Sequence, residues 1–442
     1  MNVRTARADA PAGACLATAR VLLAWSALVA LAFIWGRALV FTHHNLLLGA
    51  PPFFSPWGFH LSVRMIPALV LATAGARFGP EVASRVSWKT LLAATAVTSW
   101  AWAAAMAQVS GPGRLTGPLS IRQFDYLQTA EGIHSLHTFL SEFVDKIGSY
   151  NQHTIGHPPA MVVIEWLMLR LRIATPGWNA VLVVTGGAVA GVAALVALRE
   201  VAGEVAARRA APFVALVPAV MWWETADAFF AGVSATAVML VVLASGRRGR
   251  RADFYAFAGG VLFGLTLFLS YGLAPLALVP ATVCMRRRTS RPLAIAAIGI
   301  VPWFVGFATL GFSWFAGFIA TRNEYWQAGS AASHRPYSYF VVANLAVFAI
   351  ATGPAVAVAI TRIHDRRIWL LVGSILAVVA LVDLTGMSKG EVERIWLPFV
   401  PWAMLAAAAL STRPNSTGVL RKWLALQMAS TIVVAVAVRS QW

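Results

Sequence analysis

Two carboxylates in a long polar segment, Asp125 and Glu131, are of the type that takes a proton from an attacking hydroxyl group. Both lie in residues 110–177, which also hold several histidines and the sequence Gly156-His157-Pro158-Pro159. A carboxylate acts as a general base when it lies within hydrogen-bond reach of the reacting group. The alternative is a carboxylate that only caps or solvates a loop helix. Segment 110–177 is therefore a candidate site for acid–base chemistry, and either carboxylate could serve in it.

Basic side chains in other polar segments are of the type that binds phosphate. Arg394 and Lys389 belong to a short polar turn before an apolar stretch, and Arg335 lies in segment 311–339. Guanidinium and ammonium groups bind phosphate oxygens through charge-assisted hydrogen bonds. His157 stands before two prolines, which favour a helix start, so its ring would be held near the lipid headgroups. We expect phosphate contacts from these four residues, although His157 could simply cap the helix.

Three further residues are candidates for contacts with a polar substrate. Asp227 is expected at the mouth of an apolar helix, where a carboxylate facing lipid is costly, so it should face a cavity. Glu391 could bind a substrate hydroxyl or could only pair with Arg394 and Lys389. Tyr337 could stack on a substrate ring or belong to the aromatic belt that membrane proteins carry at the interface.

The cysteine and histidine patterns give no strong metal or disulfide signature. The chain has two cysteines, Cys15 and Cys284, which are too few for a disulfide framework or a thiolate metal site. The spacing of His134, His137 and His153 matches no strong metal motif. We therefore predict no resident metal and no certain cofactor.

The elements that position these residues must be membrane-spanning helices. The chain has 442 residues, of which 59% are hydrophobic and 12% charged, and this composition excludes a soluble fold. Apolar runs of roughly 20 residues, the length of a spanning helix, recur along it. The net charge of +18 sits in short clusters between these runs, which is typical of cytoplasmic loops and does not indicate a nucleic-acid partner.

Placing the basic clusters in the cytoplasm predicts an all-α polytopic membrane protein of about 13 transmembrane helices, within a range of 11–14. Residues 1–442 form one transmembrane domain in the cell membrane, with a cytoplasmic N-terminus and segment 110–177 outside. Residues 160–171 are apolar but interrupted by Glu165, so we expect an amphipathic helix on the outer interface. The predicted spans are 18–41, 60–78, 90–109, 178–198, 211–223, 228–246, 255–269, 272–285, 293–311, 340–361, 368–386, 395–411 and 423–438.

Several short motifs resemble the GT-C superfamily of glycosyltransferases, which use polyprenyl-phosphate sugars as donors. The shared features are an acidic residue in an early outer loop, a His-Pro-Pro sequence that opens an interfacial helix, and an Asp that opens an intramembrane helix, as in Thr225-Ala226-Asp227-Ala228. Arg335-Pro336-Tyr337, Asn344-Leu345-Ala346 and residues 389–399 look like an actinobacterial branch of these enzymes. Within that branch the chain most resembles transferases that add a methylthioxylose cap to lipoarabinomannan.

The resemblance implies an inverting transfer of a sugar from a polyprenyl monophosphate to an extracytoplasmic envelope glycan or glycolipid, with membrane lipids around the site. Asp125 would then be the catalytic base, with Glu131 in reserve, and Arg394, Arg335, Lys389 and His157 would bind the lipid phosphate. Many members of the superfamily have two adjacent acidic residues where this chain has Phe124-Asp125, so the choice of base stays open. A divalent cation held by Asp125 and the carrier phosphate also stays open.

Two other classes of function compete with this interpretation. A secondary transporter would place ionisable residues near the membrane midplane, often in broken helices of two related halves. The predicted spans are largely free of charge, and no two halves of the sequence look alike. A lipid-linked sugar flippase without catalysis is the second alternative. Loss of glycan modification on removal of an outer carboxylate would separate the enzyme from both.

Overall fold

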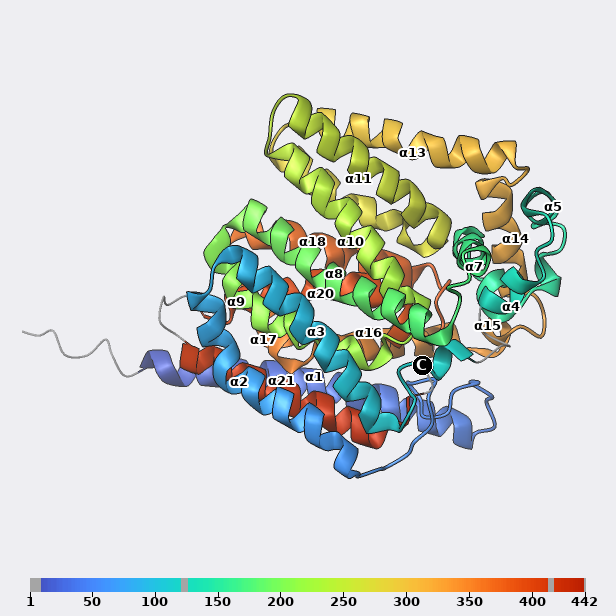
Figure 1. The fold of residues 1–442 in the computed structure, drawn as a ribbon. Helices are drawn as coiled ribbons and strands as arrows, with labels where there is room; N and C mark the ends of the chain where they lie inside the picture. The colour runs from blue at the N-terminus through green and yellow to red at the C-terminus, as the bar shows by residue number, and fades with distance from the viewer. Residues whose placement is uncertain (1–8, 121–125, 412–416, 441–442) are drawn as a thin grey trace, which may run out of the picture.

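The structure is a computed structural model that describes residues 9–120, 126–411 and 417–440 (Figure 1). The described part is helical, with two isolated β-bridges and no strand. This confirms the predicted all-α polytopic architecture. Asp125, the first candidate for the catalytic base, lies outside the described residues.

The helices follow one another along the chain with short 3-10 segments between them. Their bounds are α1 Asp9–Phe41, η1 Val63–Met65, α2 Ile66–Arg85, α3 Trp88–Ser110, η2 Pro118–Ser120, α4 Tyr126–Glu131, α5 Leu136–Ser141, η3 Ile147–Ser149, α6 Gln152–Ile155, α7 Ala160–Arg170, α8 Pro176–Ala202, α9 Glu204–Ala215, η4 Pro218–Trp222, α10 Ala226–Ser245, α11 Arg250–Leu269, η5 Tyr271–Ala277, α12 Leu278–Arg286, α13 Arg291–Thr309, α14 Trp314–Trp326, α15 Ala331–His334, α16 Tyr337–Thr352, α17 Pro354–Ile360, α18 Arg366–Leu384, α19 Val392–Ile395, η6 Leu397–Phe399, α20 Val400–Met404, η7 Leu405–Ala409 and α21 Thr417–Ala437.

Eight of the described helices are long and apolar enough to cross a membrane, and a bent pair, α16 and α17 at 100°, would make nine. The eight are α1, α3, α8, α10, α11, α13, α18 and α21. The predicted total of about 13 also included segments that the structure breaks into short helices, at 211–223, 272–285 and 395–411. Prolines such as Pro218 and Pro401 stand at the starts of short helices there and remove backbone donors. Helix α2 also fills a predicted span, shifted from 60–78 to Ile66–Arg85.

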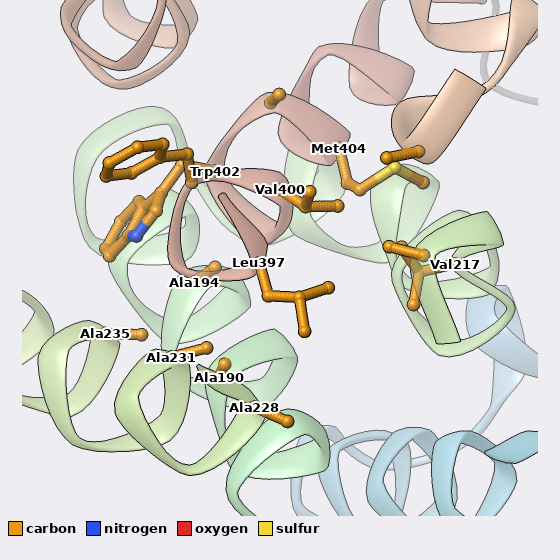
Figure 2. Close-up of a cluster of buried hydrophobic side chains, with 14 of the residues drawn as sticks. Ala190, Ala194, Val217, Ala228, Ala231, Ala235, Leu397, Val400, Trp402 and Met404 are labelled. Atoms are coloured by element: carbon orange, nitrogen blue, oxygen red, sulfur yellow. The ribbon is translucent and has the colours of Figure 1, made fainter. Parts of the chain in front are cut away.

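Close helix packing in the centre depends on small residues. A Cβ added at Gly186 of α8 would lie 2.5 Å from the Cα of Phe229 in α10, and one added at Gly232 would lie 2.5 Å from the Gly186 carbonyl oxygen. Small residues let helix backbones approach where apolar burial alone does not drive association in lipid. Figure 2 shows alanines of α8 and α10 in this region, with Leu397 of η6 facing them. The centre is therefore a tightly packed bundle that holds its ends in fixed positions.

The loops gather into two sets at opposite ends of the bundle. At one end, which we call the site end, Thr321 donates to the Ile155 carbonyl at 3.0 Å and Arg114 donates to the Ser440 carbonyl. At the other, which we call the basic end, Arg208 donates to the carbonyls of Ala83 and Val86 at 2.8 Å each. Helix α8 connects the two over 27 residues, about 40 Å. The site end comprises the loops 42–65, 111–120, 126–175, 310–336 and 385–391.

Residues 160–171, predicted as a helix on the outer interface, form α7 within the site end. It has 11 residues, too few to span a bilayer. Trp166 donates to the Ile133 carbonyl at 3.3 Å, and Glu165 is buried. Figure 1 shows α4, α5, α7 and α14 side by side at this end of the molecule. Of these short helices, α4 and α7 border the candidate site.

Candidate functional site

A buried ion-pair network is the centre of the site end. The Arg394 guanidinium lies 3.0 Å from the Asp227 carboxylate and 2.7 Å from the Glu391 carboxylate. Asp227 stands in the first turn of α10, and Arg394 belongs to the four-residue helix α19. Burial lowers the pKa of Arg394, but the two carboxylates outweigh this and raise it. Three predicted site residues therefore meet here, and Asp227 is far in the sequence from Glu391 and Arg394.

Glu391 is held between two arginines in an unusual backbone conformation. Its φ of 61° lies in the left-handed region, which is costly for a residue with a side chain and is often found at functional sites. Its second partner is Arg335, at 3.5 Å. Burial raises the pKa of Glu391, but Arg394 and Arg335 outweigh this and lower it. Glu391 therefore stays ionised and orients both guanidinium groups.

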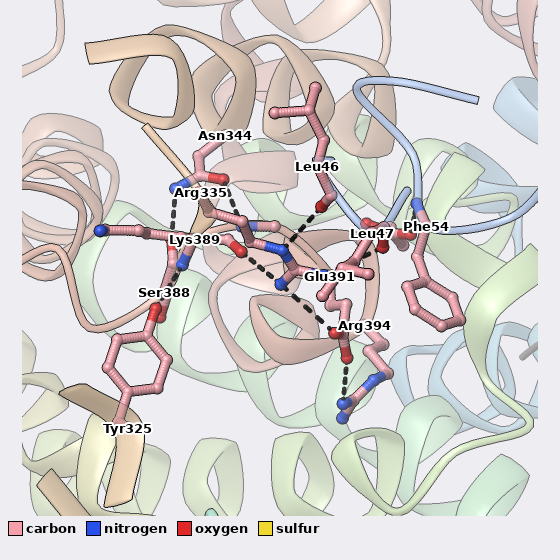
Figure 3. A network of polar contacts seen from close by, with 12 residues as sticks. Leu46, Leu47, Phe54, Tyr325, Arg335, Asn344, Ser388, Lys389, Glu391 and Arg394 are labelled. Atoms are coloured by element: carbon pink, nitrogen blue, oxygen red, sulfur yellow. Dashed lines mark hydrogen bonds and ion pairs between the residues drawn. The ribbon is translucent and has the colours of Figure 1, made fainter. Parts of the chain in front are cut away.

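Arg335 donates most of its hydrogen bonds to main-chain carbonyl groups (Figure 3). It donates to Leu46 at 3.0 Å, Leu47 at 3.1 Å and Lys389 at 2.6 Å. These bonds connect the loop after α1 to the loop before α19. Phosphate binding by Arg335 stays a prediction, but in this structure its side chain holds two loops together around Glu391.

Lys389 and Tyr337 also make contacts that fix the loops. The Lys389 ammonium donates to the Ala332 carbonyl at 3.0 Å and lies 4.5 Å from the centre of the Trp326 ring. Burial, with a smaller effect of Arg335, lowers the pKa of Lys389. Tyr337 donates to the Leu384 carbonyl at 2.9 Å. Their predicted substrate contacts remain predictions, and their observed role is positional.

A small cavity of about 40 Å³, with charged and polar side chains among its apolar walls, adjoins the ion pair. Its walls come from α4, α6, α7, α8, α10 and α19, so the short outer helices meet the long spans at this point. A cavity of this size holds one or a few water-sized groups. The polar and aromatic side chains that line it are Tyr126, His153, Glu165, Asn179, Glu224, Thr225, Asp227 and Arg394.

Glu165, Asn179 and Glu224 are buried polar residues of this cavity that were not among the predicted site residues. Asn179 donates to Glu165 at 3.2 Å, while Asn179 Oδ1 and Glu224 Oε2 are buried without a hydrogen-bond partner among the described residues. Burial raises the pKa of Glu224 to about 8, against a smaller lowering by its own backbone hydrogen bond and by Arg114. A carboxylate inside an apolar run was the available signal for Glu165.

The two histidines beside the cavity are neutral rings. His157 Nδ1 lies 3.1 Å from the Leu269 carbonyl oxygen, which can only accept, so the ring donates from Nδ1 and keeps an acceptor at Nε2. Burial lowers the pKa of His157, and burial followed by the charge of Arg394 lowers that of His153 well below its ordinary value. A neutral acceptor suits a hydroxyl donor better than the phosphate that we predicted for His157.

Of the two candidate bases, the structure describes Glu131 but not Asp125. Glu131 is exposed at the end of α4 and is not among the residues that line the cavity. Tyr126, which directly follows Asp125 in the sequence, is buried and lines it. Among the described residues, no three His, Cys, Asp or Glu side chains gather to hold a metal. The cation that we left open at Asp125 falls outside those residues.

The fold and site define a multi-pass membrane protein with a buried, charged site at one end of its bundle. No protein-family model matches the chain, and a search of curated proteins gives no significant match. Two solved structures resemble it, both of ArnT from Cupriavidus metallidurans. The apo form has 16% identity and a TM-score of 0.44. The form bound to undecaprenyl phosphate has 14% identity and a TM-score of 0.45. Each alignment covers 75% of this chain and 61% of the solved chain.

Proposed function

We propose that the protein is a glycosyltransferase that moves a sugar from a polyprenyl monophosphate to an extracytoplasmic envelope glycan or glycolipid. The observation that carries the proposal is the buried Arg394 cation, held by Asp227 and Glu391 beside a polar cavity. A guanidinium that is fixed in a buried site, where little water competes, binds a phosphate strongly. Its place at an end of the bundle suits a lipid whose phosphate lies at the membrane surface.

The chemistry would be a single displacement. The acceptor hydroxyl oxygen attacks the anomeric carbon, the bond from that carbon to the phosphate oxygen breaks, and its electron pair leaves with the polyprenyl phosphate. The hydroxyl proton goes to a carboxylate, for which Asp125 is the first candidate and Glu131 the second. Arg394 would offset the negative charge that grows on the leaving phosphate.

Sequence motifs support a finer proposal. Residues 389–399 and Arg335-Pro336-Tyr337 resemble the branch that transfers methylthioxylose to lipoarabinomannan, so the donor sugar would be methylthioxylose or another pentose or hexose. The bound undecaprenyl phosphate in one ArnT structure is the kind of lipid that we propose as carrier. The site end would then face away from the cytoplasm.

One observation favours a transporter or flippase as the second candidate. Helices α16 and α17 meet at 100° around Gly353, and broken helices are frequent in transporters. In a transporter the charged residues would be expected at that break, near the midplane. Here the nearest polar side chain to a Cβ added at Gly353 is that of Gln427, and the ion pairs lie at the site end. The enzyme is therefore the better proposal.

Purified protein in lipid nanodiscs, supplied with a polyprenyl-phosphate pentose or hexose donor and an envelope glycan extract, tests the function. Asp125→Asn removes the basic oxygen but keeps the size, so transfer should fall by roughly 10²–10⁴-fold, the usual share of general base catalysis. Glu131→Gln is the comparison in the same loop. Glu81→Gln, at the basic end, is the control and should transfer normally.

The outcomes separate the alternatives. If Glu131→Gln loses transfer and Asp125→Asn keeps it, the two assignments are exchanged. If both variants transfer normally at normal protein levels, the outer loop is not catalytic and the glycosyltransferase proposal fails. Donor movement across the bilayer without any glycan product would favour the flippase.

A further inference from the structure

A second, much larger hollow lies in the site end and is not used by the chemistry proposed above. It is an open groove of about 1130 Å³ between α4, α5 and the residues around η3. This volume is slightly above the range of about 300–1,000 Å³ that is typical of small-molecule sites. Its polar lining includes Gln128, Thr129, His134, Thr138 and Asn151.

Hydrogen bonds fix the floor of this groove. Asn151 Nδ2 donates to Thr129 Oγ1 at 3.2 Å, and Thr129 Oγ1 lies 3.0 Å from Thr154 Oγ1. The Thr154 backbone N–H donates to Asn151 Oδ1 at 3.0 Å. Three hydroxyl and amide groups, from α4, from α6 and from Asn151 at the start of α6, are therefore held in a set arrangement. This lowers the loss of side-chain entropy that accompanies ligand binding.

An aromatic ring forms part of the wall. Tyr150 lines the groove and stacks on Phe143, with ring centres 5.2 Å apart. The Phe139 ring packs edge-on against the Tyr150 ring, with ring centres 5.8 Å apart. A ring held in this way offers a fixed apolar surface with a hydroxyl at its edge, so it can contact a ligand face and a ligand polar group together.

The charges around the groove restrict the ligand. Its lining holds one acidic and one strongly basic side chain, Glu142 and Lys146, and these pair with each other at 2.5 Å. A phosphate-rich or nucleic-acid ligand needs an excess of basic over acidic groups. The groove lining has no such excess. Hydroxyl and amide groups beside an aromatic ring, with balanced charge, suit a neutral molecule rich in hydroxyl groups.

Two short helices separate the groove from the cavity beside Arg394. On α4, Tyr126 lines the cavity while Gln128 and Thr129 line the groove. On α6, His153 lines the cavity while Thr154 bonds to Thr129 of the groove floor. A chain-like ligand in the groove would therefore lie beside the site of phosphate loss.

We propose that this groove binds the acceptor and that the acceptor is a neutral oligosaccharide of at least two sugar units. The role of the groove as an acceptor site rests on the proposed transferase function, whereas its binding of a neutral oligosaccharide does not depend on that function. The groove is open and has a volume of about 1130 Å³, so a single sugar would leave much of its polar lining in water. Gln128 and Tyr150 would make contacts at its two sides.

Binding of soluble oligosaccharides to the full chain in nanodiscs tests this without any donor lipid. The probes are neutral xylo-, arabino- and manno-oligosaccharides of two to six units, with oligogalacturonate as the charged counterpart, observed by saturation-transfer NMR. Gln128→Ala should weaken binding about five- to tenfold, the effect of one lost polar contact. Tyr150→Leu should weaken it on the order of tenfold, and Tyr150→Phe less, because the phenyl ring keeps its stacking.

Gln327→Ala is the matched control, since Gln327 lies in the site end but outside the groove lining. It should bind as the unchanged protein does. If no neutral oligosaccharide binds, if oligogalacturonate binds better, or if the groove variants bind normally, the proposal is overturned. Release of sugar from the donor lipid to water, measured in the same variants, should be unchanged and reports separately on the transferase function.

Discussion

Arg421 and Arg394 both pair with carboxylates, but they do so at opposite ends of the bundle and under different conditions. At the basic end, Arg421 lies 2.8 Å from Glu81, and their side chains are 29% and 32% exposed. At the site end, Arg394 lies 3.0 Å from Asp227, and their side chains are 7% and 6% exposed. The distances are alike, so the difference lies in the surroundings. Exposed pairs contribute little to stability, whereas buried ions must offset a large loss of hydration.

The arginines at the two ends have different explanations. Arginines between apolar helices at the basic end are explained by membrane topology alone. Topology does not explain Arg394, because an ion pair in that place is rarely more stable than apolar side chains of the same size. A chain that keeps Arg394, Asp227 and Glu391 buried together therefore has a use for the charges, and phosphate binding is the use that we propose.

Sidedness is the largest effect that could break the comparison, because labelling is all or none. In a background without Cys15 and Cys284, Asp145→Cys in the site end should react with an impermeant maleimide added outside intact cells. Arg248→Cys in the basic end should react only after permeabilisation. Both positions are exposed. The reverse pattern would place the site in the cytoplasm and contradict an extracytoplasmic transferase.

Removal of each arginine should separate the two ends by stability. Arg394→Ala leaves two carboxylates buried without their cation, which should lower the free energy of unfolding by ~3–5 kcal/mol. Arg421→Ala breaks a partly exposed pair and should cost about 0.2–1 kcal/mol. Thermal unfolding of the purified variants in one detergent gives both values. Equal losses of unfolding free energy in the two variants would mean that burial does not make the Arg394 pair more important for stability than the Arg421 pair.

Donor use by the same residue should show a smaller effect. Arg394→Lys keeps a charge but loses the forked geometry, and Arg394→Ala loses both. Loss of a charged hydrogen bond typically costs about 1.5–3 kcal/mol, so kcat/KM for the polyprenyl-phosphate donor should fall roughly tenfold or more in the alanine variant, per folded molecule. The lysine variant should fall less. Unchanged donor dependence in the alanine variant would remove Arg394 from the phosphate site.

The sequence was sufficient for the helical membrane architecture and for part of the site end. Charge clusters between apolar runs predicted the helical membrane architecture, and Asp227, Glu391 and Arg394 were all predicted and do meet. The sequence pattern could not show that Arg335 donates its hydrogen bonds to the carbonyls of Leu46 and other loop residues. Those bonds depend on which loops come together in space.

The polar cavity shows the same limit. Glu165, Asn179 and Glu224 come from α7, α8 and the turn before α10, and each looks like an isolated polar residue in the sequence. The span count also differed, because prolines such as Pro401 divide apolar runs that composition alone presents as whole helices. In both cases the deciding contacts are tertiary.

Glu224 gives the most specific prediction, because it concerns the titration of a single group. Burial raises its pKa from 4.5 to about 8, so between these values the unfolded chain has lost the proton that the folded chain keeps. Stability should therefore fall as pH rises through this window, by about 1.4 kcal/mol per pH unit for this one group, and should level off above the folded pKa. Glu224→Gln cannot titrate, so its advantage in stability over the unchanged protein should grow from about pH 5 to about pH 8 and then stay constant. Thermal unfolding at a series of pH values measures the difference, with Glu81→Gln, which removes a partly exposed carboxylate at the basic end, as the control. A constant difference across the window would mean that Glu224 is ionised in the folded protein and paired with a cation at neutral pH.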